Sequence, residues 1–426
     1  MKDLASIPWF ATLVLLCGCG GSSSRTSNPS PTTLPPPNPG YTVLHAFKGG
    51  EDGAGPLALI RDEAGNLYGT TVEGGDLACP DDPYGCGTVF KLDPSGTLTT
   101  LHVFAGRPAD GANPQTSLVR DDAGNLYGGT FGGGAHQSGV VFKLDPTGNE
   151  TVLYHFDGVV EGSGAEVGVR DAAGNLYGTT EFNPFAVTCT QDCGIVFKLD
   201  ASGNLTILHK FSGSDGDSPG WGPLIRDIEG NLYGVTQFGG GNPACPWQWG
   251  CGIVFKLDPS GNFTTLHAFA GFTGDPGDVA DGQYPTGRLA QDGAGNLYGT
   301  TFGGGEQQGG TVFSLDASGK MTILHAFVNA AQENDPYGQA PQGGVVLGPP
   351  GKLYGTTSDG GRSTWGVVFE LDIESGEERV LHTLIPAGGG VPLGPLVWDG
   401  AANLYGTGSS GGDPTCDCGT VANFLP

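Results

Sequence analysis

The sequence is poor in positive charge. Its 426 residues include 18 Lys and Arg against 44 Asp and Glu, which gives a formal net charge of −26. A surface that binds nucleic acid needs clustered Lys and Arg side chains to neutralise phosphates, so we expect no nucleic-acid partner. An acidic surface instead suits divalent cations or basic partners, and it also keeps a protein soluble.

Patterns typical of helices and of common catalytic sites are also scarce. Only two Met residues occur, and no apolar 3.6-residue period continues past the first residues. The zinc-protease motif HExxH, the Walker loop and a dinucleotide-binding G-x-G-x-x-G that opens a helix are missing. GSSGG at 408–412 matches G-x-S-x-G, but about one such match is expected by chance in so glycine-rich a chain. The 79 Gly residues instead predict short strands joined by many turns.

The N-terminus has the features of an export signal. Residues 5–16 form a mainly apolar run that is too short to span a bilayer as a mature helix. The Leu-x-Gly-Cys that follows resembles the bacterial lipobox, which predicts lipidation of Cys19; the alternative is an ordinary signal peptide with incidental cysteines. Residues 20–40 are rich in Ser and Pro and are predicted to be a tether. We therefore expect a monomer at the bacterial envelope or cell surface, in contact with the membrane through its lipid anchor only.

An internal repeat dominates the remaining chain, residues 41–426. Leu-Tyr-Gly recurs at intervals of 50 to 65 residues, with its tyrosine at Tyr68, Tyr127, Tyr177, Tyr233, Tyr298, Tyr354 and Tyr405. Each copy is followed by a relative of GTVFKLD (87–93), and the first six copies also by a relative of TTLHVF (99–104). A fixed period of this length indicates a repeat architecture rather than two or three unrelated domains.

Each repeat is predicted to contain four antiparallel strands. In the first repeat these strands end near Arg61 and then cover 67–71, 88–93 and 98–104, with tight Asp/Gly/Asn/Pro turns between the first and second and between the third and fourth. Seven such units predict an all-β, seven-bladed β-propeller. The last unit lacks a fourth strand, whereas YTVLHAF at 41–47 is a fourth strand without a blade. The N-terminal strand is therefore expected to complete the last blade.

The two recurring motifs resemble those of a known family. DEAGNLYGTT (62–71) and GTVFKLD (87–93) are similar to the bacterial GloVer tandem repeat, named for Gloeobacter and Verrucomicrobia, and the resemblance covers nearly all of residues 41–426. It implies a propeller and an envelope location, and it implies no activity. The sixth unit departs from the pattern with GPPGKLYG (348–355), and the seventh has DGAANLYG (399–406).

The repeated polar residues are predicted to be structural. Seven of the eight histidines occupy one position in the fourth strand, where bonding to a neighbouring strand or turn is favoured over a metal or proton site: His45, His102, His155, His209, His267, His325 and His382. Another set opens each tight turn, where a carboxylate can accept bonds from nearby backbone N–H groups: Asp62, Asp122, Asp171, Asp227, Asp292 and Asp399.

A further set of acids precedes the first strands. Asp52, Asp110, Asp217 and Asp281 lie in loops such as EDGAGP and ADGANP, where they are candidates to line the mouth of the ring and to hold a cation such as Ca²⁺. Solvated turn residues are the favoured interpretation. We accordingly expect no cofactor, with Ca²⁺ as the alternative.

The cysteines after the signal fall into four close pairs. In an exported chain these pairs predict local disulfides in the loops between second and third strands. Zinc binding is the alternative, but no histidine accompanies the pairs. The predicted partners are Cys79 with Cys86, Cys189 with Cys193, Cys245 with Cys251, and Cys416 with Cys418.

One of these loops is rich in tryptophan. NPACPWQWGCG at 242–252 carries Trp247 and Trp249, and indoles on so short a loop suit stacking on sugar rings or on a partner protein. Trp221 and Trp365 are candidates to join them on one rim. Packing against the neighbouring blade is the alternative.

Together these features predict a non-enzymatic, surface-anchored propeller that binds a glycan or an envelope or extracellular protein through its loop-bearing face. One alternative is a carbohydrate-active hydrolase or lyase with acidic residues at the axial mouth. A second alternative is a structural module of an envelope complex.

Overall fold

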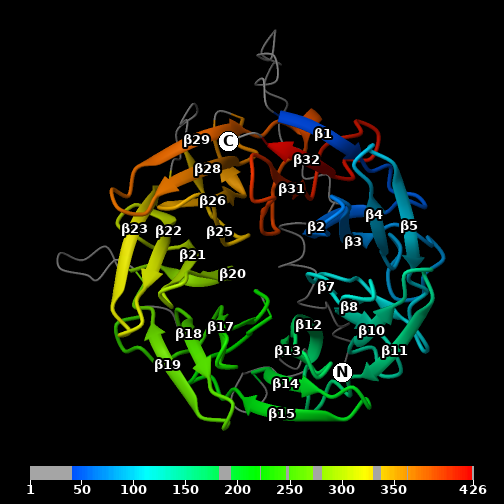
Figure 1. The fold of residues 1–426 in the computed structure, drawn as a ribbon, viewed down its shortest axis with the longest axis horizontal. Helices are drawn as coiled ribbons and strands as arrows, with labels where there is room; N and C mark the ends of the chain where they lie inside the picture. The colour runs from blue at the N-terminus through cyan, green and yellow to red at the C-terminus, as the bar shows by residue number, and fades with distance from the viewer. Residues whose placement is uncertain are drawn as a thin grey trace, which may run out of the picture.

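Seven four-stranded antiparallel sheets are arranged as blades around a central axis (Figure 1). The computed structural model describes residues 41–181, 193–220, 222–245, 249–271, 281–329, 337–361 and 363–424. Figure 1 shows the first strands nearest the axis and the fourth strands on the perimeter. The prediction of a seven-bladed, all-β propeller is thus confirmed.

The strands follow the repeat. The first three blades are β2 (Ala54–Arg61), β3 (Leu67–Glu73), β4 (Thr88–Leu92) and β5 (Leu98–Val103); β7 (Val119–Arg120), β8 (Leu126–Gly129), β10 (Val140–Leu144) and β11 (Glu150–His155); and β12 (Ser163–Arg170), β13 (Leu176–Glu181), β14 (Ile195–Leu199) and β15 (Leu205–Lys210). The fourth and fifth are β16 (Ile225–Arg226), β17 (Leu232–Thr236), β18 (Ile253–Leu257) and β19 (Phe263–Ala268); and β20 (Gln283–Gln291), β21 (Leu297–Gly303), β22 (Gln308–Leu315) and β23 (Met321–Val328). The sixth is β25 (Val345–Leu347), β26 (Lys352–Thr357), β28 (Val367–Asp372) and β29 (Glu378–Thr383).

The seventh blade joins the two ends of the chain. It consists of β30 (Val397–Trp398), β31 (Leu404–Gly408), β32 (Thr420–Phe424) and β1 (Tyr41–Ala46), with β1 paired antiparallel to β32 from Tyr41 opposite Phe424 to Ala46 opposite Thr420. This pairing confirms that the N-terminal strand completes the last blade. It also removes two strand edges that would otherwise be exposed.

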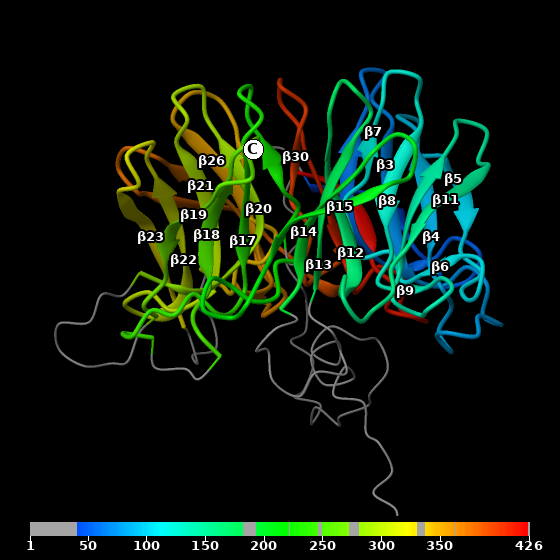
Figure 2. The ribbon, with the colours of Figure 1, turned by 90° about the horizontal axis from the view of Figure 1, so that it is seen from below.

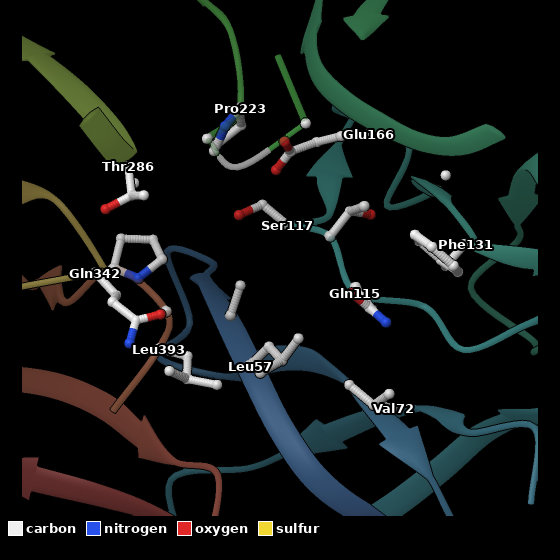
Figure 3. Close-up of a pocket in the computed structure, with 18 of the residues that line it drawn as sticks. Leu57, Val72, Gln115, Ser117, Phe131, Glu166, Pro223, Thr286, Gln342 and Leu393 are labelled. Carbon is white, nitrogen blue, oxygen red and sulfur yellow. The ribbon is translucent and has the colours of Figure 1, made fainter. Parts of the chain in front are cut away.

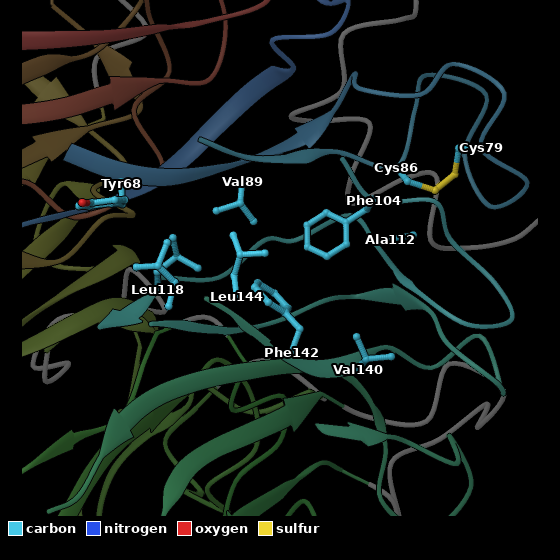
Figure 4. Packing of buried hydrophobic residues seen from close by; sticks show 11 residues of the cluster. Tyr68, Cys79, Cys86, Val89, Phe104, Ala112, Leu118, Val140, Phe142 and Leu144 are labelled. Carbon is cyan, nitrogen blue, oxygen red and sulfur yellow. A yellow bond between two sulfur atoms is a disulfide. The ribbon is translucent and has the colours of Figure 1, made fainter. Parts of the chain in front are cut away.

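The core lies between the blades. Seven clusters of buried apolar side chains occur, one at each interface between neighbouring blades. Figure 4 shows the cluster between the first and second blades, where Phe104 meets Phe142 edge to face at 5.2 Å between ring centroids. Both phenylalanines are fully buried and belong to repeated motifs. The repeat therefore supplies the same core at most interfaces.

Asp62 holds the tight turn between the first and second strands of its blade. Its carboxylate accepts the Asn66 backbone N–H and the Asn66 side-chain amide, both over 2.8 Å, and the Tyr68 hydroxyl over 3.1 Å. Burial acts to raise the pKa of Asp62, but these hydrogen bonds outweigh it and lower the pKa.

In the second blade this turn is held by Asp121 and not by the predicted Asp122. The Asn125 backbone N–H donates to Asp121 over 2.8 Å. The prediction of Asp122 is wrong because two aspartates are adjacent here. Only Asp121 lies four residues before its asparagine, as Asp62 does.

The two faces of the ring differ. Tight turns occupy one face, whereas the loops between second and third strands and the connections between blades share the other, here named the loop-bearing face (Figure 2). Two small sheets tie these two kinds of loop together: β6 (Gly111–Ala112) with β9 (Gly132–Gly133), and β24 (Gly338–Gln339) with β27 (Asp359–Gly360). A single 3₁₀ turn, η1 (Pro386–Gly388), lies among the described residues, and none of them form a helix long and apolar enough to cross a membrane.

Candidate functional site: the axial cavity

A cavity of about 160 Å³ lies on the propeller axis at the loop-bearing face. All seven blades contribute to it, mainly through the start of the first strand and the end of the second (Figure 3). Its wall is mixed: Leu57, Phe131 and Leu393 are apolar, whereas Gln115 and Gln342 carry amides. A largely apolar wall with a few polar groups is the usual composition of a small-molecule site.

Glu166 is the most enclosed charged side chain of the cavity. It lies in β12, the innermost strand of the third blade, and its side chain points into the cavity in Figure 3. The residue is only 6% exposed, and its Oε2 atom is buried without a hydrogen-bond partner. Burial, and then the nearby Glu181, raise its pKa well above the usual value, while a hydrogen bond from the Gly222 N–H and the charge of Arg288 act in the opposite direction.

Two further glutamates line the same cavity. Glu181, the last residue of β13, has its pKa raised to about 8 by burial and by the negative charge of Asp217. Glu73, the last residue of β3, has its pKa raised to about 7 by burial and by Asp82. Near neutral pH, Glu181 is therefore mainly protonated, whereas Glu73 is divided between its two forms.

Arg288 supplies positive charge from two blades further along the ring. Arg288 belongs to β20 in the fifth blade and lines the cavity. Its side chain is exposed to the space of the cavity, and protein surrounds that space. This enclosure lowers its pKa, and the charge of Glu166 acts to raise it. The site thus combines one guanidinium, three carboxyl groups and two amides around a small space.

The sequence contained a signal for Glu166 and Arg288 that motif searching missed. Counted back from the turn residue, Glu166 occupies a position that is Leu57, Thr116, Gly222, Gly287, Gly343 or Gly394 in the other blades. Arg288 replaces Ala58, Ser117, Val167, Pro223, Gly344 or Pro395. A charged residue at an innermost position that is small or uncharged in every other copy therefore marks the site.

The four tryptophan candidates do not form one described cluster. Trp249 is 52% exposed, in the loop between β17 and β18. Trp365 is partly buried and packs against the seventh blade in a cluster with Leu396 and Phe424. The fifth blade lies between the loops that carry these two residues. Trp221 and Trp247 lie outside the described residues, so their place in a binding rim stays a prediction.

The acids expected at the mouth of the ring lie elsewhere. Asp52, Asp110 and Asp281 pair with histidines of the outer strands: the distances between carboxylate oxygen and Nε2 are 3.2 Å to His45, 3.3 Å to His102 and 2.8 Å to His267. None of the four predicted aspartates lines the axial cavity. The acids that do line it are glutamates of the second and first strands.

Asp217 has a different environment from the other three predicted aspartates. It is buried and accepts the Ser218 hydroxyl over 3.0 Å, whereas Asp215 pairs with His209, also over 3.0 Å. In SGSDGDS, Asp215 is the residue followed by glycine, as in the other loops, so the repeat pattern fits Asp215 better than the predicted Asp217.

Three of the four predicted disulfides are present. Cys79–Cys86, Cys245–Cys251 and Cys416–Cys418 are bonded, with Cα–Cα distances of 5.6, 5.8 and 5.2 Å. Each closes a loop on the loop-bearing face. Cys189, the predicted partner of Cys193, lies outside the described residues.

The sequence matches a profile of the Gloeobacter/Verrucomicrobia repeat over residues 22–245 and 166–338. No curated protein matches it. Similar solved structures include a streptogramin B lyase (13% identity, TM-score 0.55, covering 91% of this chain and 97% of that one) and a catalytically inactive virginiamycin B lyase from Staphylococcus aureus with quinupristin (11%, 0.56, 91% and 99%). Another is the extracellular domain of a proposed one-component system from B. thetaiotaomicron (10%, 0.54, 90% and 39%). At such identities the likeness concerns the fold alone.

Proposed function

Because the chain belongs to the Gloeobacter/Verrucomicrobia repeat family, which is described by its repeat and not by an activity, we propose its function from the axial cavity: the protein binds a small, hydroxyl-rich ligand, such as one sugar unit of a glycan, at the loop-bearing face. Fold alone does not specify function, so the proposal depends on the chemistry of the cavity.

The observation that carries the proposal is the Oε2 atom of Glu166, which is buried without a hydrogen-bond partner. A buried polar group without a hydrogen bond costs about 1–3 kcal/mol. The fold does not require a carboxyl group at this position, since the six other blades have an uncharged residue there. A ligand hydroxyl or amine that reaches Glu166 Oε2 would recover the lost hydrogen bond.

The size and lining of the cavity restrict the ligand. Its volume of about 160 Å³ is well below the ~300–1,000 Å³ of sites that enclose drug-sized ligands. One sugar ring or a similarly small group fits this restriction better than a long chain. The Phe131 ring and the Gln115 and Gln342 amides offer the apolar face and the hydrogen bonds that a sugar ring uses.

A second candidate is a hydrolase or lyase that acts on a carbohydrate at the same site. The observation that favours it is the pair Glu166 and Glu181, whose raised pKa values keep a carboxylic acid protonated near neutral pH. A general acid needs that property. A glycoside hydrolase also needs an ionised carboxylate as nucleophile or base. Binding without reaction remains our first proposal because the pKa values of Glu73, Glu166 and Glu181 are all raised, which disfavours that ionised partner.

Calorimetric titration tests both candidates. The purified protein is titrated with glucose, galactose, N-acetylglucosamine and galacturonic acid, and oligosaccharides of each are incubated with it and analysed for products. We expect binding of at least one sugar, loss of that binding in Glu166→Gln and in Arg288→Gln, and no product. Product formation that Glu181→Gln abolishes would favour the enzyme. Binding that depends on Trp249→Ala and not on Glu166→Gln would contradict the axial site.

We also propose that the propeller is exported and anchored at the bacterial envelope by a lipid on Cys19, with residues 20–40 as the tether. The three disulfides support an oxidising compartment. Metabolic labelling with a fatty-acid analogue should mark the wild-type chain and not Cys19→Ser; equal labelling of both would contradict the anchor.

A further inference from the structure

Between the outer strands of the first and second blades, three potential metal ligands converge. His102 lies in β5, Asp110 in the connection to the second blade, and Glu150 at the first position of β11. One atom from each lies within 4.8 Å of the other two. His102 Nε2 is 3.3 Å from Asp110 Oδ2 and 3.7 Å from Glu150 Oε2.

Comparison with the other blades shows that this group is unusual because a third potential ligand, Glu150, joins an outer His–Asp pair. The outer His–Asp pairs recur as His45–Asp52, His209–Asp215 and His267–Asp281. The position of Glu150, opposite the last residue of the third strand, is filled by Leu98, Leu205, Phe263 or Met321 in four blades and by Tyr41 in the seventh. In the sixth blade it is filled by Glu378, whose Oε2 lies 3.1 Å from His325 Nε2. A hydrophobic residue there suffices for the fold, so the added carboxylate needs another explanation.

The distances fit a metal ion as well as a hydrogen-bonded pair. Two ligand atoms of a tetrahedral Zn²⁺, each bonded at about 2.0–2.2 Å, lie about 3.4 Å apart. The 3.3 and 3.7 Å separations at His102 bracket that value. The outer His–Asp pairs without a described third ligand are 3.2, 3.0 and 2.8 Å apart: His45–Asp52, His209–Asp215 and His267–Asp281.

The surroundings of these side chains also suit a binding site, because they hold the potential ligand atoms in place. The Asp110 carboxylate is fixed by the Ala105 N–H over 2.8 Å and by the Gly111 N–H over 2.6 Å. Glu150 Oε1 is buried without a hydrogen-bond partner, although its carboxyl group faces another acid. Two close carboxylates repel each other, and a divalent cation would neutralise both. His102 also lines an open surface cleft together with Glu51 and Asp76, which offers an acidic route for a cation.

We propose that His102, Asp110 and Glu150 form a zinc site with a fourth position open to solvent, which links the outer strands of the first and second blades. Imidazole together with carboxylates favours zinc over calcium, which prefers oxygen ligands alone. The other cluster with suitable spacing among the described residues, Cys79, Asp81 and Cys86, is unsuitable because its cysteines form a disulfide.

Calorimetric titration of the untagged, chelator-treated protein with ZnCl₂ tests this proposal. We expect one Zn²⁺ per chain, with the affinity reduced at least about tenfold in Glu150→Gln and in His102→Gln. His267→Gln is the matched control, because it removes the same ring from a pair without a third ligand, and its zinc affinity should equal that of the wild type. Met321→Glu should add a second site beside His267 and Asp281.

Several outcomes would overturn the proposal. These are no zinc binding by the wild type, unchanged zinc affinity in Glu150→Gln, an equal loss in His267→Gln, or tighter binding of Ca²⁺ than of Zn²⁺. Circular dichroism of each variant without metal shows that it is folded. An outcome here does not depend on whether the axial cavity binds a sugar, since the two sites share no residue.

Discussion

Two sets of acidic residues in this ring have opposite electrostatic environments. The turn aspartates, such as Asp62 and Asp171, accept several hydrogen bonds, and their pKa values are lowered although burial acts to raise them. The axial glutamates Glu166 and Glu181 have few donors, and burial raises their pKa values. The first set recurs in nearly every blade and stabilises it. The second occurs once and costs stability, which is the expected mark of a functional site.

Loss of the N-terminal strand should reduce the stability of the protein more than any other change considered, since it disrupts one of the repeated blades. Without residues 41–47 the seventh blade loses its fourth strand, and the buried Phe47 leaves a cavity beside Phe90. Removal of one such phenylalanine side chain costs about 3–5 kcal/mol, so a chain that begins at residue 48 should lose most of its total stability of ~5–15 kcal/mol. Thermal melting followed by circular dichroism measures the loss; an unchanged melting temperature would contradict the closure.

The turn aspartates and the axial glutamates should change the stability of the protein in different ranges of pH. The turn aspartates have lowered pKa values; for Asp399 the pKa is lowered to about 2 although burial acts to raise it. Their contribution to the free energy of unfolding is therefore lost as pH falls below about 4. The pKa values of Glu73 and Glu181 are raised to about 7 and 8, so charging them should reduce stability as pH rises from about 4.5 to 8, by roughly 2 kcal/mol or more. Urea unfolding across this range should show a maximum near pH 4–5, and the decline above it should flatten in Glu181→Gln. A maximum that stays at pH 7 would contradict the raised pKa values.

Asp62→Ala should destabilise the protein by about 2 kcal/mol, because it leaves the Asn66 N–H and the Tyr68 hydroxyl without their acceptor. Sugar binding should not change, since Asp62 does not line the cavity. Urea unfolding and sugar titration of this variant check both statements. A loss of binding in the folded variant would show that the turn residues take part in the site.

Glu166→Gln should have the smallest effect on stability and the opposite sign. It removes a buried acid from an environment that disfavours its charge, so at pH 8 we expect the free energy of unfolding to rise by about 1 kcal/mol. Leu57→Ile, which conserves volume in the same cavity wall, is the control and should change stability little. A clear loss of stability in Glu166→Gln would mean that Glu166 holds the fold together.

The repeat made the fold predictable, and its irregularities limited the predictions about sites. Seven copies of LYG and six of GxVF are enough to place strands and turns, because each copy obeys the same local rules. SGSDGDS offers two aspartates, and the structure shows that Asp215, rather than the predicted Asp217, pairs with His209. Trp365 packs inward because Gly390 of the next blade leaves room for its ring, and no property of its own loop predicts that.

The axial site was missed for a different reason. Glu166, Glu181 and Arg288 lie in three separate strands, and they meet only because first and second strands of different blades converge at the axis. Alignment of the repeats with one another marks two of these residues as unusual. Their common cavity is visible only once the ring is closed.

The most direct test of the central claim compares thermal shifts of the wild type, Glu166→Gln and Trp249→Ala with glucose, galactose, N-acetylglucosamine and galacturonic acid, each at high concentration. A ligand that binds only the folded state raises its melting temperature. We predict that at least one sugar stabilises the wild type and Trp249→Ala but not Glu166→Gln. A shift that persists in Glu166→Gln, or no shift with any of the four sugars, would contradict a sugar site in the axial cavity.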